Sequence, residues 1–402
     1  MANDLLLVGS VPLETAEEVM RMFGAPLGRY LATLPDGEVG DQRYWVLKHS
    51  MYLFNGHPEL IVLQRPAPDD GVERLVPRDR EDVWRFRVAD GVDRVRFGEP
   101  GWRLGYTKDA VSSYFVFSSL RDRGVIPRHL RFQLSLPLVN SVVSPLTFPR
   151  PGDLDQVKPG YAEALKAEIA KILEKIPHDD LAIQWDCSWE ITDMYGGLPG
   201  FAKEGALERN APQFRALSKD IPEAVMLGYH FCFGTFGGWP RFAPEDLSGA
   251  VALANAAAAG SGRRVDWLNI PALDRSDDAF FRPLADLDPK GARVYLGLIH
   301  NMRGFDERVA AAREFLPEFG LSAPCGFGRC ATSELPDILK DHLAAMKKVG
   351  AKGARRSTRL AKRKPARRVA ARTRPSKKTT KPRNKRTRRS AARAQRSGRR
   401  AR

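Results

Sequence analysis

Short runs of apolar residues alternate with amphipathic segments along the first 350 residues of the chain. Each apolar run has the length of a strand and is apolar on both faces. Strands buried on both faces are typical of parallel sheets, which helices cover on each side. We therefore predict eight strands, at residues 5–8, 30–33, 132–136, 181–186, 225–232, 266–270, 294–300 and 323–327.

Many of the segments between these runs have the 3.6-residue period of an amphipathic helix. In segment 159–176, Leu165, Ile169 and Leu173 fall on one face, with lysines and glutamates opposite. Eight strands that alternate with helices favour an α/β fold of the (β/α)8 TIM-barrel type over an open sheet. The other predicted helices cover residues 14–23, 244–259, 306–315 and 336–349.

Segment 42–131 is too long to be a simple connection between two strands of a barrel. It contains two β-type runs, 84–88 and 92–97, on either side of Asp90-Gly91, a dipeptide that favours a tight hairpin turn. We interpret 42–131 as an insertion after the second strand. It either covers the barrel mouth or decorates a surface away from the site, and the sequence leaves both alternatives open.

Charge divides the chain into two parts. The formal net charge is +17, but 24 of the 65 basic residues and no acidic residue lie after residue 350, which leaves 41 basic against 48 acidic residues before it. Segment 351–402 lacks Phe, Trp, Tyr, Ile and Met, so it cannot bury a core. We predict a barrel domain over 1–350 and a disordered tail over 351–402. The tail suits nucleic acid or another polyanion, bound without sequence preference, or else it is a solvated tail without a partner.

The number of cysteines and the N-terminal residues indicate the cellular compartment. Four cysteines are too few for a disulfide scaffold in a chain of 402 residues, so we expect reduced thiols that are available for metal binding or catalysis. The apolar run at 5–8 follows Asp4 and is too short for a signal peptide. No apolar run approaches the length that spans a bilayer. The sequence therefore predicts a cytoplasmic protein.

Candidate metal ligands follow two of the predicted strands. Active sites of such barrels form at the C-terminal ends of the strands. His230 and Cys232 are two residues apart on a strand, so their side chains point to the same side, and Cys325 lies in the last predicted strand. One imidazole and two thiolates suit Zn²⁺, which in catalytic sites keeps a position open for substrate. The alternative is a packed cysteine beside an ordinary histidine.

Five short motifs occur in order along the barrel segment: Val-Gly-Ser-Val-Pro at 8–12, Leu-Pro-Asp-Gly-Glu at 34–38, Gln-Trp-Asp at 184–186, His-Phe-Cys at 230–232 and Cys-Gly-Phe at 325–327. Together they resemble the catalytic, C-terminal barrel of the cobalamin-independent methionine synthase family, and more closely its short single-barrel relatives. The match runs over roughly residues 5–348. Each motif is short, and the specificity lies in their common order and spacing.

The resemblance implies zinc-dependent methyl transfer to a small-molecule thiol such as homocysteine, with a folate or a methylcorrinoid as methyl donor. It implies that His230, Cys232 and Cys325 bind Zn²⁺. Asp186 would pair with the ammonium group of the amino-acid thiol, and Ser10 would hold its carboxylate. Zinc lowers the pKa of a thiol, which otherwise ionises near pH 8.5, and so supplies a nucleophile at neutral pH.

Three further residues are candidates: His300 and Glu38 under the same resemblance, and Trp185 because it lies near a strand end. His300 would protonate the departing nitrogen of a folate-type donor, since a histidine titrates near neutral pH. Glu38, in the segment typical of the short relatives, would contact the substrate, and Trp185 would stack on a flat ligand. The alternatives are an inner-barrel histidine for His300, a structural ion pair for Asp186 and core packing for Trp185.

One departure from the family pattern keeps a second function open. The resemblance implies a zinc-binding glutamate on the strand after His-x-Cys, but the strand at 266–270 has no carboxylate at its exit and carries Asn269 there. The alternative is a diverged barrel that binds or transforms another small molecule and carries a polyanion-binding tail.

Overall fold

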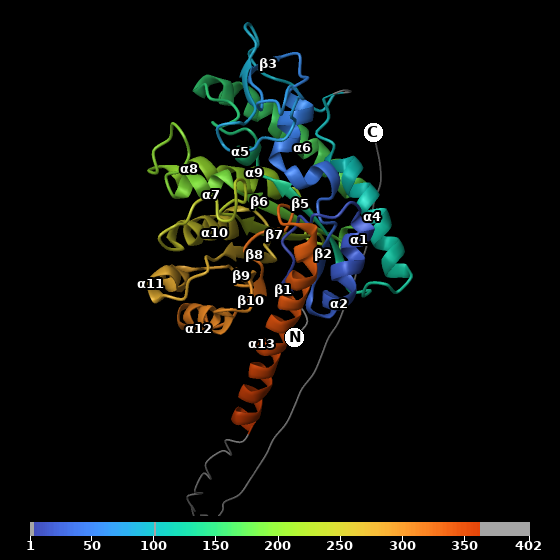
Figure 1. The fold of residues 1–402 in the computed structure, drawn as a ribbon, viewed down its shortest axis with the longest axis vertical. Helices are drawn as coiled ribbons and strands as arrows, with labels where there is room; N and C mark the ends of the chain where they lie inside the picture. Colours follow the sequence, from blue (N-terminus) through green and yellow to red (C-terminus); the bar gives the residue numbers. More distant parts are fainter. Residues whose placement is uncertain (1–3, 100–101, 362–402) are drawn as a thin grey trace, which may run out of the picture. The chain divides into compact units, whose positions relative to one another are not determined.

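The computed structural model describes residues 4–99 and 102–361, with side chains to residue 350. Its central feature is a ring of eight parallel strands surrounded by helices, a (β/α)8 TIM-type barrel (Figure 1). The strand order is β1-β10-β9-β8-β7-β6-β5-β2, and a parallel bridge between Leu5 and Leu31 links the first strand to the segment before the second. The strands are β1 (Leu5–Leu6), β2 (Thr33–Pro35), β5 (Arg131–Pro137), β6 (Leu181–Cys187), β7 (Met226–Phe231), β8 (Trp267–Pro271), β9 (Arg293–Gly297) and β10 (Gly320–Ser322).

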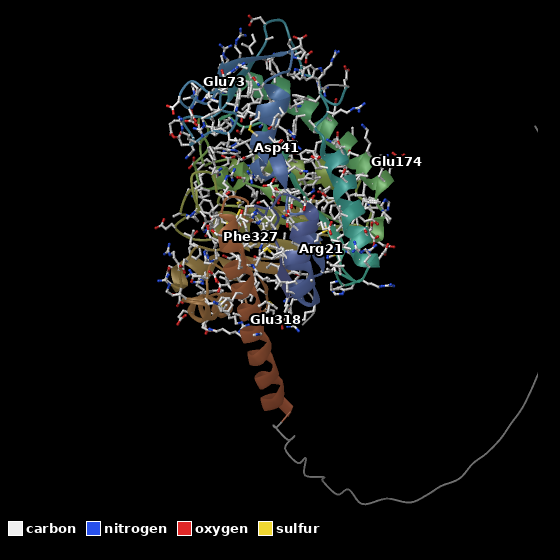
Figure 2. All side chains as sticks on the ribbon, turned by 45° about the vertical axis from the view of Figure 1, so that its right-hand side comes forward. Arg21, Asp41, Glu73, Glu174, Glu318 and Phe327 are labelled. Atoms are coloured by element: carbon white, nitrogen blue, oxygen red, sulfur yellow. The ribbon has the colours of Figure 1, made fainter. Side chains whose placement is uncertain are left out.

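Helices form the outer layer of the barrel and carry exposed charged side chains, of which Arg21 and Glu174 are examples (Figure 2). No helix of the described segments has the length and apolar character needed to cross a membrane. The helices are α1 (Ala16–Val19), α2 (Ala25–Leu27), α3 (Val46–Lys48), α4 (Tyr106–Asp122), α5 (Val139–Val142), α6 (Pro151–Lys175), α7 (Trp189–Met194), α8 (Ala206–Asn210), α9 (Pro212–Ser218), α10 (Ser248–Gly260), α11 (Asp278–Phe281), α12 (Phe305–Phe315) and α13 (Leu335–Ala361).

Two strands are displaced from their predicted positions. A 3-10 turn over Gly28–Tyr30 occupies the start of the predicted second strand, so β2 begins only at Thr33. The last strand, β10, ends at Ser322, before the predicted run at 323–327 begins. Pro324 lacks the N–H that a continuing ladder would need, so Cys325 lies in a loop rather than in a strand.

Polar side chains fill part of the barrel interior and tie the strands together. The Thr33 hydroxyl donates to Gln133 Oε1 at 2.6 Å, and Gln133 Nε2 donates to the Val8 carbonyl at 3.1 Å. Gln184 Nε2 donates to the same carbonyl at 2.7 Å and to Asp186 Oδ1 at 2.8 Å. Because these buried groups satisfy one another, the inward row of β6 is held in one orientation below the mouth.

The segment predicted as an insertion has two parts. Its last part contains α4, which packs on α1 and α6 as an ordinary barrel helix. The earlier part contains π-helical turns at His49–Phe54 and an antiparallel pair of strands, β3 (Leu60–Gln64) and β4 (Arg85–Val88). The extra structure is therefore confined to the residues before α4.

The predicted hairpin around Asp90-Gly91 is wrong. The partner of β4 is β3, which precedes it in the chain, and the residues after Gly91 do not turn back along β4. They run instead along α6, where Val95 N donates to the Gln156 carbonyl at 3.0 Å. Helix α6 admits this approach at Gly160, because a Cβ there would lie 2.0 Å from the Val95 carbonyl oxygen.

Helix α6 also begins earlier than predicted. It starts at Pro151, where a proline is tolerated because the first N–H groups of a helix have no partner, and it runs through Pro159 to Lys175. Helix α13 continues to Ala361, so the first residues of the segment predicted as a disordered tail are helical. The rest of that predicted tail, 362–402, lies outside the described residues.

Candidate active site

Three predicted metal ligands converge at the C-terminal mouth of the barrel. His230 lies on the inner face of β7, Cys232 follows directly after β7, and Cys325 lies in the loop after β10. One ligand atom from each lies within 4.8 Å of the other two, and the two sulfurs are 3.0 Å apart. Among the described residues this is the one group of three or more His, Cys, Asp or Glu side chains that could hold a metal ion.

The imidazole of His230 presents a free lone pair to this group. Its Nδ1 lies 2.6 Å from Asn269 Oδ1 on the neighbouring strand β8. Asn269 Nδ2 donates to Ser322 Oγ at 2.6 Å, which fixes the amide so that its oxygen faces the ring. Nδ1 is then the protonated nitrogen, and the buried Nε2 has no hydrogen-bond partner. Metal-binding histidines typically have one ring nitrogen held by such a hydrogen bond, which orients the other nitrogen toward the metal.

The two sulfurs differ in charge state. The hydrogen bond from Cys325 holds the pKa of Cys232 well below its usual value. The backbone N–H of Gly234 also donates to Cys232 Sγ, at 3.2 Å. The same contact with Cys232, together with burial, raises the pKa of Cys325. The geometry therefore stabilises one thiolate, the form in which cysteine binds metals.

Buried carboxyl groups line the pocket floor beside the sulfurs. Asp186 pairs in register with His230 across β6 and β7, and burial raises its pKa to about 7. Glu38 has φ of 48°, and a Cβ on Gly9 would lie 2.3 Å from its Oε1, so this carboxylate occupies the space that the glycine leaves. Burial first, and then repulsion from Asp186, raises the pKa of Glu38 well above its usual value. A cationic group between these acids would relieve both costs.

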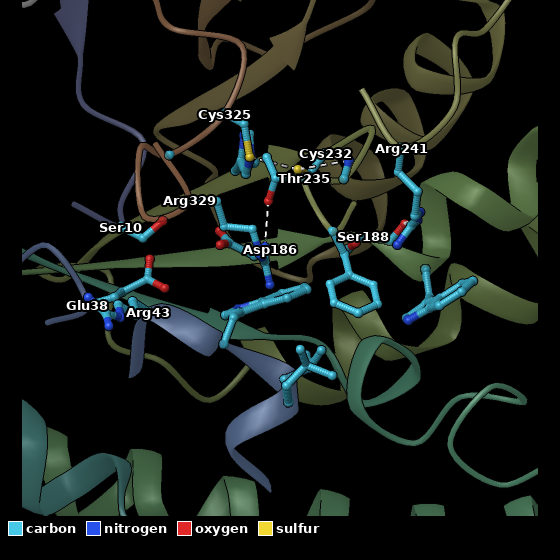
Figure 3. Close-up of a pocket in the computed structure, with 18 of the residues that line it drawn as sticks. Ser10, Glu38, Arg43, Asp186, Ser188, Cys232, Thr235, Arg241, Cys325 and Arg329 are labelled. Atoms are coloured by element: carbon cyan, nitrogen blue, oxygen red, sulfur yellow. Dashed lines mark hydrogen bonds between the residues drawn. The ribbon is translucent and has the colours of Figure 1, made fainter. Parts of the chain in front are cut away.

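Ser10 joins the first strand to the loop that carries Cys325. Its Oγ accepts from Gly328 N at 3.3 Å, and its carbonyl accepts from Phe327 N at 2.6 Å. A Cβ at Gly326 would meet Ser10 Oγ at 2.5 Å, so only glycine permits this approach. Ser10 lines the same pocket as Glu38 and Asp186 (Figure 3).

The walls of the pocket contain residues that the sequence did not single out. Trp45 and Trp84 belong to the extra structure before α4 and line the pocket, so this segment covers the barrel mouth. Three arginines also line it: Arg43, Arg241 and Arg329 (Figure 3). They lie in loops and irregular turns, where no periodicity indicates which way a side chain points.

The predicted substrate contact of Trp185 is wrong. Trp185 is fully buried, and its Nε1 donates to Ser218 Oγ of α9 at 3.1 Å. Residues alternate across a strand, so the inward positions of Gln184 and Asp186 send Trp185 outward, between the sheet and its helices. The indole therefore packs in the core and does not line the pocket.

His300 lies beside the pocket rather than in it. It lines a second pocket with His342 and Trp239, and the two pockets share Cys325 and Arg329. His300 Nε2 is 2.8 Å from the Ala272 carbonyl, so it is the protonated nitrogen. Burial lowers the pKa of His300, which favours the neutral ring.

Comparison with known proteins supports the fold. No model of a known protein family matches the chain, and no curated protein matches it. Among solved structures, it is similar to a B12-independent methionine synthase from Shewanella sp. W3-18-1 in complex with selenomethionine, with a TM-score of 0.51, 14% identity and coverage of 88% of this chain and 99% of that one. A Listeria monocytogenes protein described as a candidate vitamin-B12-independent methionine synthase gives a TM-score of 0.48, 14% identity and coverage of 83% and 86%.

The chain therefore has a methionine-synthase-like barrel fold. At this identity the likeness establishes the fold alone, and the chemistry must be argued from the site.

Proposed function

We propose that this protein catalyses metal-assisted methyl transfer to a small-molecule thiol at the barrel mouth. The observation that supports this most directly is the convergence of His230, Cys232 and Cys325 above the buried carboxyl groups, with His230 Nε2 left without a partner. An unsatisfied, buried imidazole nitrogen is costly unless something binds it.

The residues present fit Zn²⁺. One imidazole nitrogen and two sulfurs are its preferred ligand types, and three protein ligands leave a position for substrate. Bound there, zinc would supply a Lewis acid that lowers the pKa of the thiol substrate into the neutral range. His230 is oriented for this role by Asn269, and Cys232 by the N–H of Gly234.

The other polar residues of the pocket would bind an amino-acid thiol of the homocysteine type. Asp186 and Glu38 face the same pocket as the sulfurs, so they would hold the ammonium group. A bound ammonium group would favour the ionised form of Asp186, whose pKa burial raises to about 7. Ser10, at the edge of the cysteine loop, would bind the carboxylate through its hydroxyl or through nearby backbone N–H groups.

His300 is proposed as the group that protonates the departing nitrogen of a folate-type donor, from the second pocket. Because burial lowers its pKa, the neutral ring must first gain a proton, and a donor with an anionic group nearby would favour this. A methylcorrinoid donor would not require the step.

One observation favours a second candidate function. The resemblance implies a zinc-binding glutamate on the strand next to His230. That strand instead carries the amide Asn269, which contacts His230. The alternative is a diverged barrel that uses the same pocket to bind or transform another small molecule, with the basic C-terminal segment binding a polyanion.

Elemental analysis of the purified protein tests the metal. We expect one zinc per chain in the wild type and in Cys330→Ser, whose sulfur is not part of the ligand group, and loss of zinc in Cys232→Ser. Zinc in neither the wild type nor the variants, or retained in all three, contradicts the site.

A transfer assay then separates the two functions. Homocysteine is supplied with a methylfolate or with a methylcorrinoid, and methionine is measured. Zinc binding with no transfer from either donor favours the diverged barrel.

A further inference from the structure

Two arginines that line the pocket, Arg241 and Arg329, form no ion pair that would stabilise the fold within the described residues. Arg241 follows the glycine-rich turn after β7, and Arg329 follows the loop after β10. Figure 3 shows both side chains extending into the cavity that contains Cys232 and Cys325. Neither forms an ion pair with a carboxylate of the described residues, although arginines elsewhere in the barrel do.

Arg241 is held in place without its charge being neutralised. Its guanidinium lies 4.3 Å from the ring centre of Trp189, and it donates to the Ser188 carbonyl and to the Thr192 hydroxyl. Its Nε is buried and has no hydrogen-bond partner. The guanidinium is therefore fixed by an aromatic face and neutral acceptors, with one donor left unused.

Arg329 is fixed in a similar way on the other side of the cysteines. Its Nη1 donates to Thr235 Oγ1 at 2.6 Å, and its guanidinium lies 5.6 Å from the ring centre of Phe236. Glu38 is near enough for an electrostatic effect but forms no ion pair with it. Two oriented guanidinium groups thus line one pocket and keep donors free.

The two arginines oppose each other electrostatically. Burial, and to a smaller extent the positive charges of Arg80 and Arg329, lowers the pKa of Arg241 to about 10, although the charge of Cys232 opposes the shift. Two like charges in one partly buried pocket are unfavourable, and the single thiolate of Cys232 offsets only part of this cost, so a further anion beside them would be favourable. The carboxyl groups of Asp186 and Glu38 line the same pocket, but neither forms an ion pair with Arg241 or Arg329.

We infer that Arg241 and Arg329 form an oxyanion-binding subsite for the second ligand of the pocket, a molecule that carries a carboxylate or a phosphate. Arginine forks match both groups geometrically. The neighbouring rings of Trp189 and Phe236 would border a flat part of the same ligand. The assignment of this ligand as the methyl donor rests on the proposed function, whereas anion binding does not.

Thermal unfolding of the full chain with added anions tests the subsite. A ligand that binds only the folded protein raises the unfolding midpoint. The basic C-terminal segment is the same in all variants, so anions bound to it do not affect the comparison between them. Inorganic phosphate and glutarate are the probes, and the variants are Arg241→Gln, Arg329→Gln and Arg241→Lys. The matched control is Arg303→Gln, an exposed arginine in a loop outside both pockets.

We expect at least one probe to stabilise the wild type and Arg303→Gln equally. Its apparent Kd should be about tenfold weaker in each Gln variant, as expected for the loss of one charge-assisted hydrogen bond, and partly recovered in Arg241→Lys. The probe that stabilises more identifies the oxyanion. Equal stabilisation of the wild type and both Gln variants, or no stabilisation of any, overturns the subsite.

Two further measurements keep this test separate from the proposed function. Zinc content should be unchanged in Arg241→Gln, because Arg241 does not belong to the ligand group. Homocysteine should stabilise Arg241→Gln as much as the wild type. If homocysteine binding weakens as well, the arginines hold the thiol substrate's own carboxylate, and the assignment to a second ligand is wrong. Absence of zinc from the wild-type protein would contradict the metal proposal but would not affect the conclusion on anion binding.

Discussion

The strand ends at the barrel mouth and the segment that covers them are held in place by different interactions. We call the part of segment 42–131 that precedes α4 the cover. The mouth is polar: His230, Asp186 and Asn269 lie side by side on three neighbouring parallel strands and are held by hydrogen bonds. The cover is apolar: Phe54 lies in a cluster of aromatic rings that fastens it to α6. A polar site with fixed directions is thus closed by a segment whose attachment depends mainly on aromatic packing, with a few hydrogen bonds such as that between His49 and Tyr161.

This difference separates stability from chemistry. The sheet fixes the positions of side chains on its strands, and their hydrogen bonds fix their orientations. The mouth can therefore hold several metal-binding atoms at defined positions. Aromatic packing is strong but not directional, so the cover can exclude water without holding a reacting group. We therefore expect substitutions in the two regions to have separable effects.

The largest expected effect is in the cover. Phe54 is fully buried, and its ring centre lies 5.3 Å from that of Phe148 and 5.7 Å from that of Phe86. Phe54→Ala should lower the free energy of unfolding by about 3–5 kcal/mol, because it removes a large buried ring and leaves a cavity. Urea unfolding measures this change. Zinc content should not change, because no metal ligand lies in the cover.

Phe115→Ala is the matched control for Phe54→Ala. Phe115 lies on α4 with 73% of its surface exposed, so its removal should change the free energy of unfolding by less than about 0.5 kcal/mol. If the two variants are equally stable, the aromatic cluster does not fasten the cover. If Phe54→Ala loses zinc while it remains folded, the two regions are not separable.

A smaller effect is expected from the pH dependence of the cover. His49 is buried against Tyr161, whose hydroxyl is 3.0 Å from His49 Nδ1, and burial lowers the pKa of His49 from 6.5 to about 3. The unfolded chain therefore takes up a proton below pH 6.5 that the folded chain refuses until about pH 3. The stability that His49 contributes is complete above pH 6.5 and is lost as the pH falls.

His49→Gln removes this titration. The stability advantage of the wild type over His49→Gln should shrink by about 2 kcal/mol between pH 8 and pH 5, as 1.5 pH units below the unfolded pKa imply. Urea unfolding of both proteins at the two pH values measures it. An advantage that stays constant, or that grows toward pH 5, would show that His49 is not held neutral.

The smallest expected effect concerns the support of the metal ligand. Asn269→Ala removes the acceptor that orients His230, so zinc should bind about tenfold more weakly, measured by competition with a chromogenic chelator. Asn269→Asp keeps an oxygen acceptor and should restore most of the affinity. Zinc binding as tight in Asn269→Ala as in the wild type would mean that His230 needs no such support, or does not bind the metal.

Sequence periodicity was sufficient for the barrel and for much of its mouth. The alternation of residues along a strand predicted that His230 and Cys232 point to the same side, and both belong to the group of candidate ligands. The same rule, applied fully, would have excluded Trp185 from the site. The prediction failed there because aromatic character was given more weight than the direction that a strand imposes.

The cover could not be predicted in the same way. The strand β4 was expected to pair with residues just after Gly91, but it pairs with β3, because the contact of Val95 with α6 is a tertiary interaction that no local pattern records. Arg241 and Arg329 were missed for a related reason. They lie in turns rich in glycine, where backbone angles vary and the direction of a side chain depends on its neighbours.

The clasp between Ser10 and the residues after Cys325 lies where the two ends of the barrel meet. The second sulfur of the ligand group therefore belongs to the last strand connection to be synthesised, and its position depends on a contact with the first. A ribosome-bound chain that lacks this closing turn would carry His230 and Cys232 without their partner. Metal acquisition would then mark the completion of the ring, so a loaded site would report that the whole barrel, and not only its central strands, has assembled.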